Sequence, residues 1–153
     1  MAVAATDYTV TASNAGGSTS APVEITVGVL ATLADGFAAE VFADGLLQPA
    51  KFALAPDGRV FFNERETGRT RVLASDGTLR AAPFAETDVL ASGHQGLLGI
   101  VLHPGFETNG WVYVQACVAG SGMESDRVRI MRYTEVDGMD AGTNATVIAD
   151  DLP

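Results

Sequence analysis

The sequence predicts an all-β chain of 153 residues, most of it a partial β-propeller with a β-hairpin before it. From about residue 36 onward, short apolar segments alternate with Pro-Asp-Gly, Thr-Gly, Asp-Gly and Asn-Gly turn signals. No window holds a capped helical stripe of ten residues or more. The strand and turn pattern also repeats once, at the spacing that propeller blades require. These three observations predict stacked sheets.

The first expected element is a β-hairpin within residues 7–27. Apolar and polar residues alternate over 8–13 and again over 23–27, which is the period of a strand with one solvated face. The glycine pair at 16–17 predicts the turn between them. Because a lone hairpin is only marginally stable in water, this one is expected to have been part of a larger sheet.

The segment 8–18 resembles the last two strands of the immunoglobulin-like modules of bacterial surface and secreted proteins. The resemblance makes residues 1–28 the end of such a module and residues 29–37 a linker. The third region, 38–153, is the propeller segment.

Eight strands are expected in this third region. They lie at 39–43, 51–55, 59–63, 70–74, 97–102, 111–117, 128–134 and 145–149. The unit around Pro56 is echoed around Pro104, 48 residues later, and each unit continues into a strand that carries arginine. Four strands in about 40 to 50 residues make one blade, and a ring needs roughly 4 to 8 blades. About two blades of such a ring are therefore expected, with an open edge that favours self-association.

Composition excludes several classes of protein. The 9 Lys and Arg residues against 19 Asp and Glu give a net charge of −10, which argues against nucleic-acid binding. No apolar run approaches the roughly 18 residues that a membrane span needs. The single cysteine, Cys117, excludes an internal disulfide framework and a zinc cluster of paired thiolates.

The densest candidate site is the loop Ser92–Gly96. His94 and Gln95 lie there between glycines, directly before the apolar strand expected at 97–102. In a propeller, such a loop leads into the innermost strand of a blade and lines the mouth of the central channel. The alternative interpretation is a polar turn whose glycines only supply backbone freedom.

Other polar residues favour structural roles. His103 lacks the converging ligands of a metal site, so we expect it to stabilise the turn before Pro104. The acidic residues between 137 and 151 do not follow EF-hand spacing, which indicates a solvated turn. The charged hairpin tip at 64–69 predicts surface ion pairs of small worth.

Several segments resemble the N-terminal part of the glucose/sorbosone dehydrogenase family. The most specific is Gly96-Leu97-Leu98-Gly99 with His103-Pro104 and Phe106 downstream, and the resemblance covers about residues 36–153. It implies a six-bladed propeller that holds pyrroloquinoline quinone (PQQ) with calcium. A hydride passes there from the anomeric carbon of a sugar to the quinone, while a histidine removes the hydroxyl proton. It also implies a bacterial protein of the periplasm or the cell exterior.

The resemblance assigns His94 and Gln95 to substrate or cofactor binding. His94 stands where soluble glucose dehydrogenases have a glutamine that faces both cofactor and sugar. The proton-abstracting histidine would follow a stretch like 148–153, so this chain is expected to lack it, to hold neither PQQ nor calcium, and to be inactive. The intact parent would be a quinoprotein oxidoreductase that acts on CH–OH groups of a sugar or polyol.

The alternative is a non-enzymatic propeller that binds carbohydrate or protein on a secreted surface protein, because a fold does not determine a function.

Overall fold

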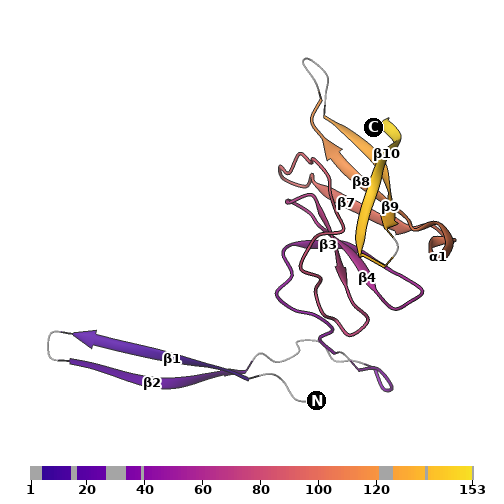
Figure 1. Cartoon of the computed structure of the whole chain (residues 1–153). Coiled ribbons are helices and arrows are strands. Elements are labelled where there is room, and N and C mark those ends of the chain that lie inside the picture. Colours follow the sequence, from indigo (N-terminus) through magenta and orange to yellow (C-terminus); the bar gives the residue numbers. More distant parts are fainter. Residues whose placement is uncertain are drawn as a thin grey trace. The chain divides into compact units, whose positions relative to one another are not determined.

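The computed structural model describes residues 5–14, 17–26, 34–38, 40–120, 126–136 and 138–152. The chain divides into two compact units, residues 1–40 and 41–153, and Figure 1 traces both. In the first unit β1 (Ala5–Asn14) pairs with β2 (Gly17–Thr26) in an antiparallel hairpin. The hairpin predicted within 7–27 is confirmed, while its turn at 15–16 lies outside the described residues.

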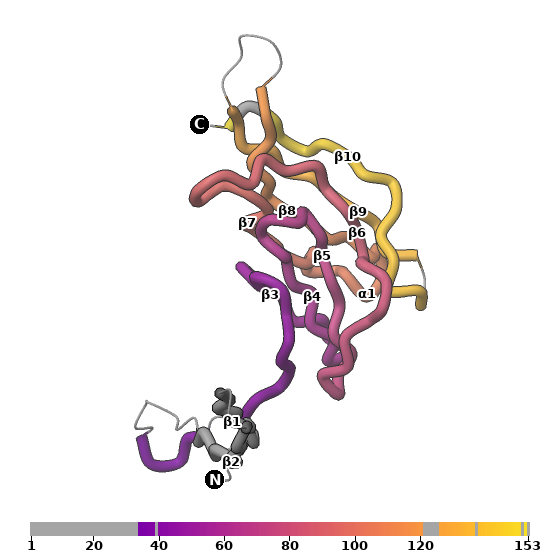
Figure 2. Tube along the Cα trace, turned by 90° about the vertical axis from the view of Figure 1, so that its left-hand side faces the viewer, coloured from indigo at the N-terminus to yellow at the C-terminus, as the bar shows by residue number. Residues whose placement is uncertain are grey.

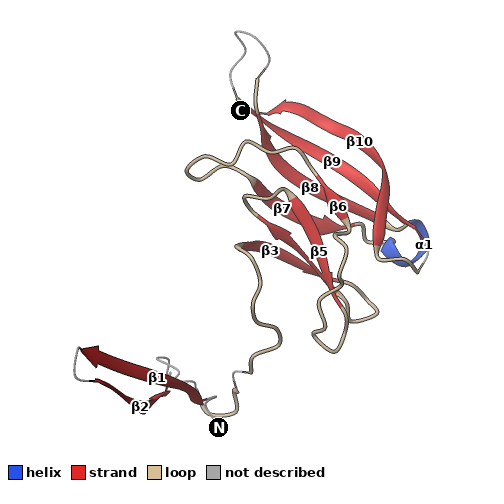
Figure 3. Ribbon diagram, turned by 60° about the vertical axis from the view of Figure 1, so that its left-hand side comes forward, coloured by secondary structure: helices blue, strands red, loops and turns tan. Residues whose placement is uncertain are grey.

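The second unit contains two four-stranded antiparallel sheets. The first sheet has the order β3 (Pro49–Leu54), β4 (Val60–Glu64), β5 (Arg69–Leu73) and β6 (Ala85–Glu86). The second has the order β7 (Leu97–Leu102), β8 (Trp111–Val118), β9 (Arg127–Val136) and β10 (Ala141–Leu152). The short helix α1 (Phe106–Asn109), blue in Figure 3, lies between β7 and β8 in sequence. None of the helices in the described ranges is long and apolar enough to cross a membrane.

The sequence repeat maps one sheet onto the other. Each sheet is a meander of four consecutive strands, and Figure 2 follows both along the Cα trace. Pro56 lies between β3 and β4, and Pro104 lies between β7 and β8, so the two prolines occupy equivalent turns. The prediction of an all-β fold with two four-stranded blades is confirmed.

One predicted strand is wrong and one strand was missed. Residues 40–43 form no strand, because alternation alone does not supply a partner strand. They pass beside the Gly77 turn instead, where a Cβ on Gly77 would lie 2.3 Å from the Phe42 carbonyl oxygen. The missed strand is β6, which has only two residues and therefore no readable period.

The core lies between the two sheets. Its fully buried members come from β4, β5, β7, β8 and the segment before β6, and include Phe61, Val72, Phe84, Leu97, Val112 and Val114. Phe61 makes edge-to-face contacts with Phe84 and Phe106, with ring centroids 5.2 and 5.5 Å apart. The edge strands β3 and β7 contact each other, and so do β6 and β10 at the opposite edges. Two sheets that meet in this way are arranged like neighbouring blades.

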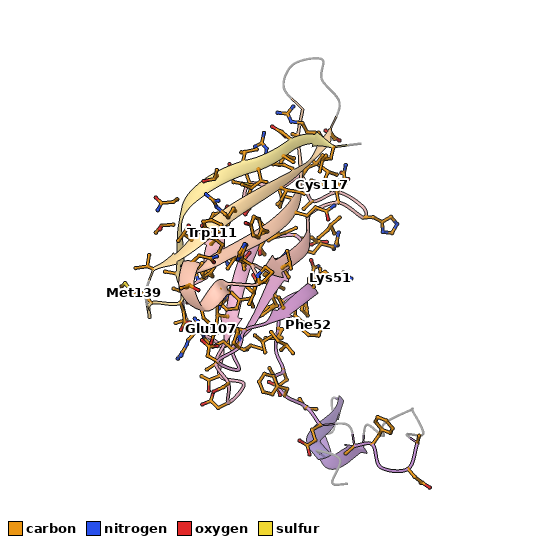
Figure 4. All side chains as sticks on the ribbon, turned by 90° about the vertical axis from the view of Figure 1, so that its right-hand side faces the viewer. Lys51, Phe52, Glu107, Trp111, Cys117 and Met139 are labelled. Atoms are coloured by element: carbon orange, nitrogen blue, oxygen red, sulfur yellow. The ribbon has the colours of Figure 1, made fainter. Side chains whose placement is uncertain are left out.

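The outward faces of the two sheets carry exposed apolar side chains. Phe52 and Leu54 of β3 are 66% and 67% exposed, and Val101 of β7 is 58% exposed. Phe52 and Trp111, one on each sheet, are labelled in Figure 4. Single exposed apolar residues are common on protein surfaces, but these three lie on β3 and β7, the first strand of each sheet.

Candidate functional site

The candidate site is the loop at residues 92–96, which leads into β7. His94 is exposed, Gln95 is half-buried, and Gly96 and Leu97 are buried. β7 and β3 are the edge strands at which the two sheets meet, so the loop emerges beside that junction. The polar residues His94 and Gln95 are therefore followed directly by residues that are buried in the core.

The base of the loop is fixed by main-chain hydrogen bonds to both sheets. The Leu97 amide donates to the Arg65 carbonyl oxygen at 2.9 Å, and the Cys117 amide donates to the Gly96 carbonyl oxygen at 2.9 Å. Gly96 has a φ of +129°, and a Cβ there would lie 2.3 Å from the Arg65 carbonyl oxygen. Only glycine combines this conformation with so close an approach of main chain.

The Arg65 side chain holds the polar tip of the loop. Its Nη1 donates to the carbonyl oxygens of Gly93 at 2.7 Å and Gln95 at 3.0 Å, the residues on either side of His94. Its own amide donates to the Gln48 carbonyl oxygen at 3.1 Å, just before β3. We call these five residues, Gln48, Arg65, Gly93, Gln95 and Leu97, the Arg65 junction. It joins the hairpin tip of the first sheet to the loop of the second.

A network of buried polar side chains supports the first residues of β7. The Asn63 side-chain amide donates to the Gly99 carbonyl oxygen at 2.8 Å, and the Thr70 hydroxyl donates to Asn63 Oδ1 at 2.9 Å. Asn63 and Thr70 are both fully buried. The register of β7 against β8 shifts between Leu97 and Gly99, so the Gly99 carbonyl turns to Asn63 at an irregular position. This network fixes β7 where the loop enters it.

The side chains of His94 and Gln95 are left available by this arrangement. Within the described part of the chain, the His94 imidazole forms no hydrogen bond or ion pair. Gln95 Nε2 lies 3.5 Å from Asp126 Oδ2, the outer limit of a hydrogen bond. An imidazole and a carboxamide can each donate to and accept from a polar ligand. Among the described residues, no three His, Cys, Asp or Glu side chains converge as metal ligands.

His103 has the structural role predicted for it. Its Nδ1 accepts a hydrogen bond from the Gly105 amide at 2.9 Å and lies 2.8 Å from the Asn109 side-chain amide nitrogen. With Nδ1 as acceptor, the neutral ring carries its proton on Nε2. Its ring also packs against Trp111, with centroids 5.1 Å apart. His103 therefore stabilises the turn between β7 and β8.

Within the charged tip at 64–69, the expectation of a surface ion pair is wrong for Glu64, which is buried. Glu64 is 3% exposed and accepts hydrogen bonds from Thr67 Oγ1 at 2.8 Å and Arg71 Nη1 at 3.1 Å. Arg65 bonds the 92–96 loop as described. Arg65 also pairs with the partly exposed Glu66, and Arg69 pairs with Glu86 at 2.9 Å while both side chains stay exposed, so these two pairs agree with the expectation.

The expectation of a solvated acidic turn is wrong for Asp140, which is 16% exposed; Asp150 is exposed but lies in β10, and Asp137 and the Asp151 side chain lie outside the described residues. Asp140 accepts hydrogen bonds from Arg59 at 2.5 Å and pairs with Arg80 at 2.6 Å. Asp150 accepts hydrogen bonds from Arg127 and Arg129 on the neighbouring strand, at 3.1 and 2.7 Å. These carboxylates bind arginines because the fold brings together charges that lie far apart in sequence.

Arg59 forms a second connection between the sheets. Its guanidinium bonds both carboxylate oxygens of Glu135 and reaches Asp57 and Asp140. Hydrogen bonding to Glu135 holds the pKa of Arg59 above its usual range, and the bond from Arg59 lowers the pKa of Asp57 below its ordinary value of 3.8. The guanidinium also lies over the Phe61 ring, 5.2 Å from its centroid. This cluster of charges ties β4 to β9 and to the turn before β10.

Comparison with known proteins assigns the chain to a family. The model of the glucose/sorbosone dehydrogenase family matches residues 46–153. The chain belongs to the glucose/sorbosone dehydrogenase family. The match covers both sheets and includes the Arg65 junction and the loop with His94 and Gln95.

Three known proteins are similar to this chain over part of their own length. Quinoprotein glucose dehydrogenase B of Acinetobacter calcoaceticus is 30% identical over 83 residues, which are 52% of this chain and 17% of that protein. A putative oxidoreductase (glucose dehydrogenase) from Thermus thermophilus has a TM-score of 0.63 at 32% identity, and the similarity covers 74% of this chain and 32% of that protein. The PQQ-bound aldose sugar dehydrogenase of Streptomyces coelicolor has the same fold, with a TM-score of 0.58 at 24% identity, over 74% of this chain and 33% of its own. The chain thus spans about a third of these structures and less of the curated relative.

Proposed function

We propose that this chain contributes two blades to a PQQ-dependent sugar dehydrogenase, and that the 92–96 loop presents His94 and Gln95 to the sugar or the quinone. The observation that carries the proposal is the loop itself. Its ends and its carbonyl groups are bonded to both sheets, while the His94 imidazole is exposed and has no partner among the described residues. A loop whose main chain is bonded at both ends and at its carbonyl groups holds its exposed side chains in a defined place, which favours ligand binding.

The two side chains fit a quinone or a sugar chemically. Both ligands carry oxygen atoms that accept hydrogen bonds, and sugar hydroxyls also donate them. The His94 imidazole and the Gln95 carboxamide match both patterns. When bound, the quinone would supply the acceptor for the hydride of the sugar, and the curated relative is itself named a quinoprotein.

The proposed role of His94 is binding rather than proton removal. An imidazole works as a base near neutral pH when a second group orients it. No such group contacts His94 within the described residues. We place the proton-abstracting histidine and the calcium ligands in a part of the intact protein beyond these 153 residues, and propose that this segment alone is inactive.

The remaining proposals concern the protein that carries this segment. Its substrate is a sugar or polyol, its electron acceptor is unassigned, and its place is the bacterial periplasm or the cell exterior. The hairpin of residues 1–28 would end an immunoglobulin-like module, with 29–37 as a linker to the propeller. The support is the family match and the resemblance of the hairpin.

The exposed apolar faces are proposed to be covered by further blades. Phe52, Leu54 and Val101 are each more than half exposed in this chain. When the 153 residues are made alone, we expect them to self-associate through these faces and through the open edge of the sheet. Light scattering that shows a clean monomer with cooperative melting would contradict this.

The test of the proposed function is sugar oxidation by the full-length gene product. The protein is reconstituted with PQQ and calcium and assayed with a dye acceptor across a panel of aldoses. His94→Ala is expected to raise KM about fivefold with little change in kcat, the effect of losing one hydrogen bond of about 1 kcal/mol to the ground state and transition state alike. His94→Gln, which introduces the amide that glucose enzymes have there, is the matched variant and is expected to shift the preference toward glucose.

Two outcomes separate the proposal from its rival. Oxidation of an aldose whose KM depends on His94 supports the dehydrogenase. Retained sugar binding without oxidation of any aldose would favour the non-enzymatic binding module instead.

A further inference from the structure

The Arg65 guanidinium is the one group in the described residues that bonds the main chain on both sides of His94. Its Nη1 donates to the carbonyl oxygens of Gly93 and Gln95 at 2.7 and 3.0 Å. Its Nη2 pairs with the Glu66 carboxylate. One nitrogen with two N–H groups thereby fixes two carbonyls that belong to a single turn of the loop.

The main chain of Arg65 is fixed independently of its side chain. Its amide donates to Gln48 just before β3, and its carbonyl accepts the Leu97 amide at the start of β7. The Cα of Arg65 is therefore anchored to both edge strands before the guanidinium makes any bond. A side chain that starts from a fixed point orders its target at a smaller entropic cost.

The bonds are of a strong kind. A hydrogen bond with a charged partner contributes about 1.5 to 3 kcal/mol, roughly twice the value for a neutral pair. The Arg65 side chain is 26% exposed, so water competes for it only in part. The loop itself has one internal main-chain bond among its described residues, from the Gln95 amide to the Ser92 carbonyl oxygen. The guanidinium is thus the main support of the loop tip.

We propose that Arg65 is a positioning residue: its guanidinium sets the conformation of the loop and with it the direction in which His94 and Gln95 meet their ligand. The identity of the ligand rests on the proposed function, whereas the hold on the loop does not. Arginine suits this role because its planar group has two terminal nitrogens at a fixed spacing, so that Nη1 bonds the two carbonyls while Nη2 bonds Glu66. A lysine at this position would retain charge but not this geometry.

The first experiment measures amide hydrogen exchange in the full-length gene product. Arg65→Met removes every donor and keeps the apolar stem, so exchange at the Gln95 amide should accelerate about tenfold, the equivalent of one charge-assisted bond. Exchange at the Leu97 amide should change less, because its acceptor is the Arg65 main chain. Arg65→Lys should give an intermediate rate.

Arg69→Met is the matched control. Arg69 lies on the same hairpin and pairs with Glu86, and these side chains are 46% and 63% exposed. This variant should leave exchange in residues 92–97 unchanged. If Arg65→Met leaves the Gln95 amide within twofold of the wild type, or if Arg69→Met has the same effect as Arg65→Met, the inference is overturned.

The second experiment separates positioning from general support of the fold. In the reconstituted full-length product, Arg65→Met should raise KM for the sugar at least about fivefold while kcat changes less than twofold, and Arg65→Lys should recover part of the loss. Equal falls in kcat for all sugars with unchanged KM would contradict the inference. A wild-type protein that oxidises no sugar would refute the proposed function, and the exchange experiment would still decide the role of Arg65.

Discussion

Two arginines at the ends of one short strand connect the same two sheets in different ways. Arg59 precedes β4 and Arg65 follows it, so they lie six residues, or about 20 Å, apart along an extended chain. Arg59 bonds the carboxylates of Glu135 and Asp140, whereas Arg65 bonds main-chain carbonyl oxygens of the 92–96 loop. Among the described residues, Arg59 pairs with Glu135 and Asp140 of the second sheet as well as with Asp57, whereas Arg65 pairs with its neighbour Glu66.

This difference gives the two arginines different roles: Arg59 stabilises the packing of the two sheets, and Arg65 orders the 92–96 loop. Carboxylates that are 10% and 16% exposed need their cation, because an unpaired charge in such a place is strongly unfavourable. Carbonyl groups of an exposed loop can turn to water when their donor is removed. We therefore expect changes at the Arg59 end to lower stability, and changes at the Arg65 end to alter loop order first.

The largest effect is expected from removing the ion pairs of Arg59. Arg59→Met leaves Glu135 and Asp140 partly buried with one cation fewer, and should lower the free energy of unfolding by about 3 kcal/mol. Urea denaturation measures this. Amide exchange in the 92–96 loop should rise only as global unfolding does. The control Arg69→Met removes an exposed pair and should cost less than about 1 kcal/mol. Similar losses for both variants would show that the Arg59 cluster has no special weight.

The second largest effect is expected from a substitution that disturbs the main-chain contact between Gly96 and Arg65. Gly96→Ala places a Cβ against the Arg65 carbonyl oxygen in a backbone conformation that only glycine adopts, and should cost about 2 to 3 kcal/mol. Gly93→Ala is the matched variant, since Gly93 also has a positive φ, +58°, but open space around it. It should cost only about 1 kcal/mol. Equal costs would mean that the close approach of Gly96 to Arg65 is unimportant.

The fold could be predicted because its signals are local. Alternation over four to six residues and Asp-Gly or Pro-containing turns specify strands and their connections, so β7 was predicted at its observed bounds. The two-residue β6 and the four-residue α1 are too short to show a period. The strand expected at 39–43 failed because pairing is decided by neighbours far away in the chain.

The site could be predicted only in part, for a related reason. Glycines around His94 and Gln95 indicate an irregular polar loop, and that information is contained in five residues. Arg65 could not be recognised, because its acceptors are main-chain carbonyls 28 and 30 residues away, and any residue type supplies a carbonyl. Glu64 was missed because its burial is set by Arg71 on the neighbouring strand.

A smaller effect tests the support that lies behind the loop. Thr70→Val keeps the shape of the side chain but leaves Asn63 Oδ1 without its donor in a fully buried place, and should lower stability by about 1.5 kcal/mol. Thr70→Ser keeps the hydroxyl and should cost less than half as much. The loss for Thr70→Val should also appear as faster exchange at the start of β7. A valine variant as stable as the serine variant would remove the network from the description of the site.

The smallest expected effect is on the stability of the protein in acid, which depends on Asp57 beside Arg59. The bond from Arg59 lowers the pKa of Asp57 below 3.8, and a carboxyl whose pKa falls on folding stabilises the protein above its unfolded value. That contribution is present above about pH 4 and is lost as the pH falls below 3.8 through the folded value. Because the Asp57 side chain is 51% exposed, it amounts to no more than about 0.5 kcal/mol.

Asp57→Asn removes the charge and keeps an oxygen that can accept the Arg59 amide bond. The difference in unfolding free energy between pH 6 and pH 3 should shrink in this variant, and the shrinkage should vanish when Arg59→Met is already present. Asp76 lies in a similar Asp-Gly turn, but the Thr78 amide lowers its pKa, so Asp76→Asn should act equally with or without Arg59. If the effect of Asp57→Asn persists without Arg59, the acid sensitivity belongs to the turn and not to the connection between the sheets.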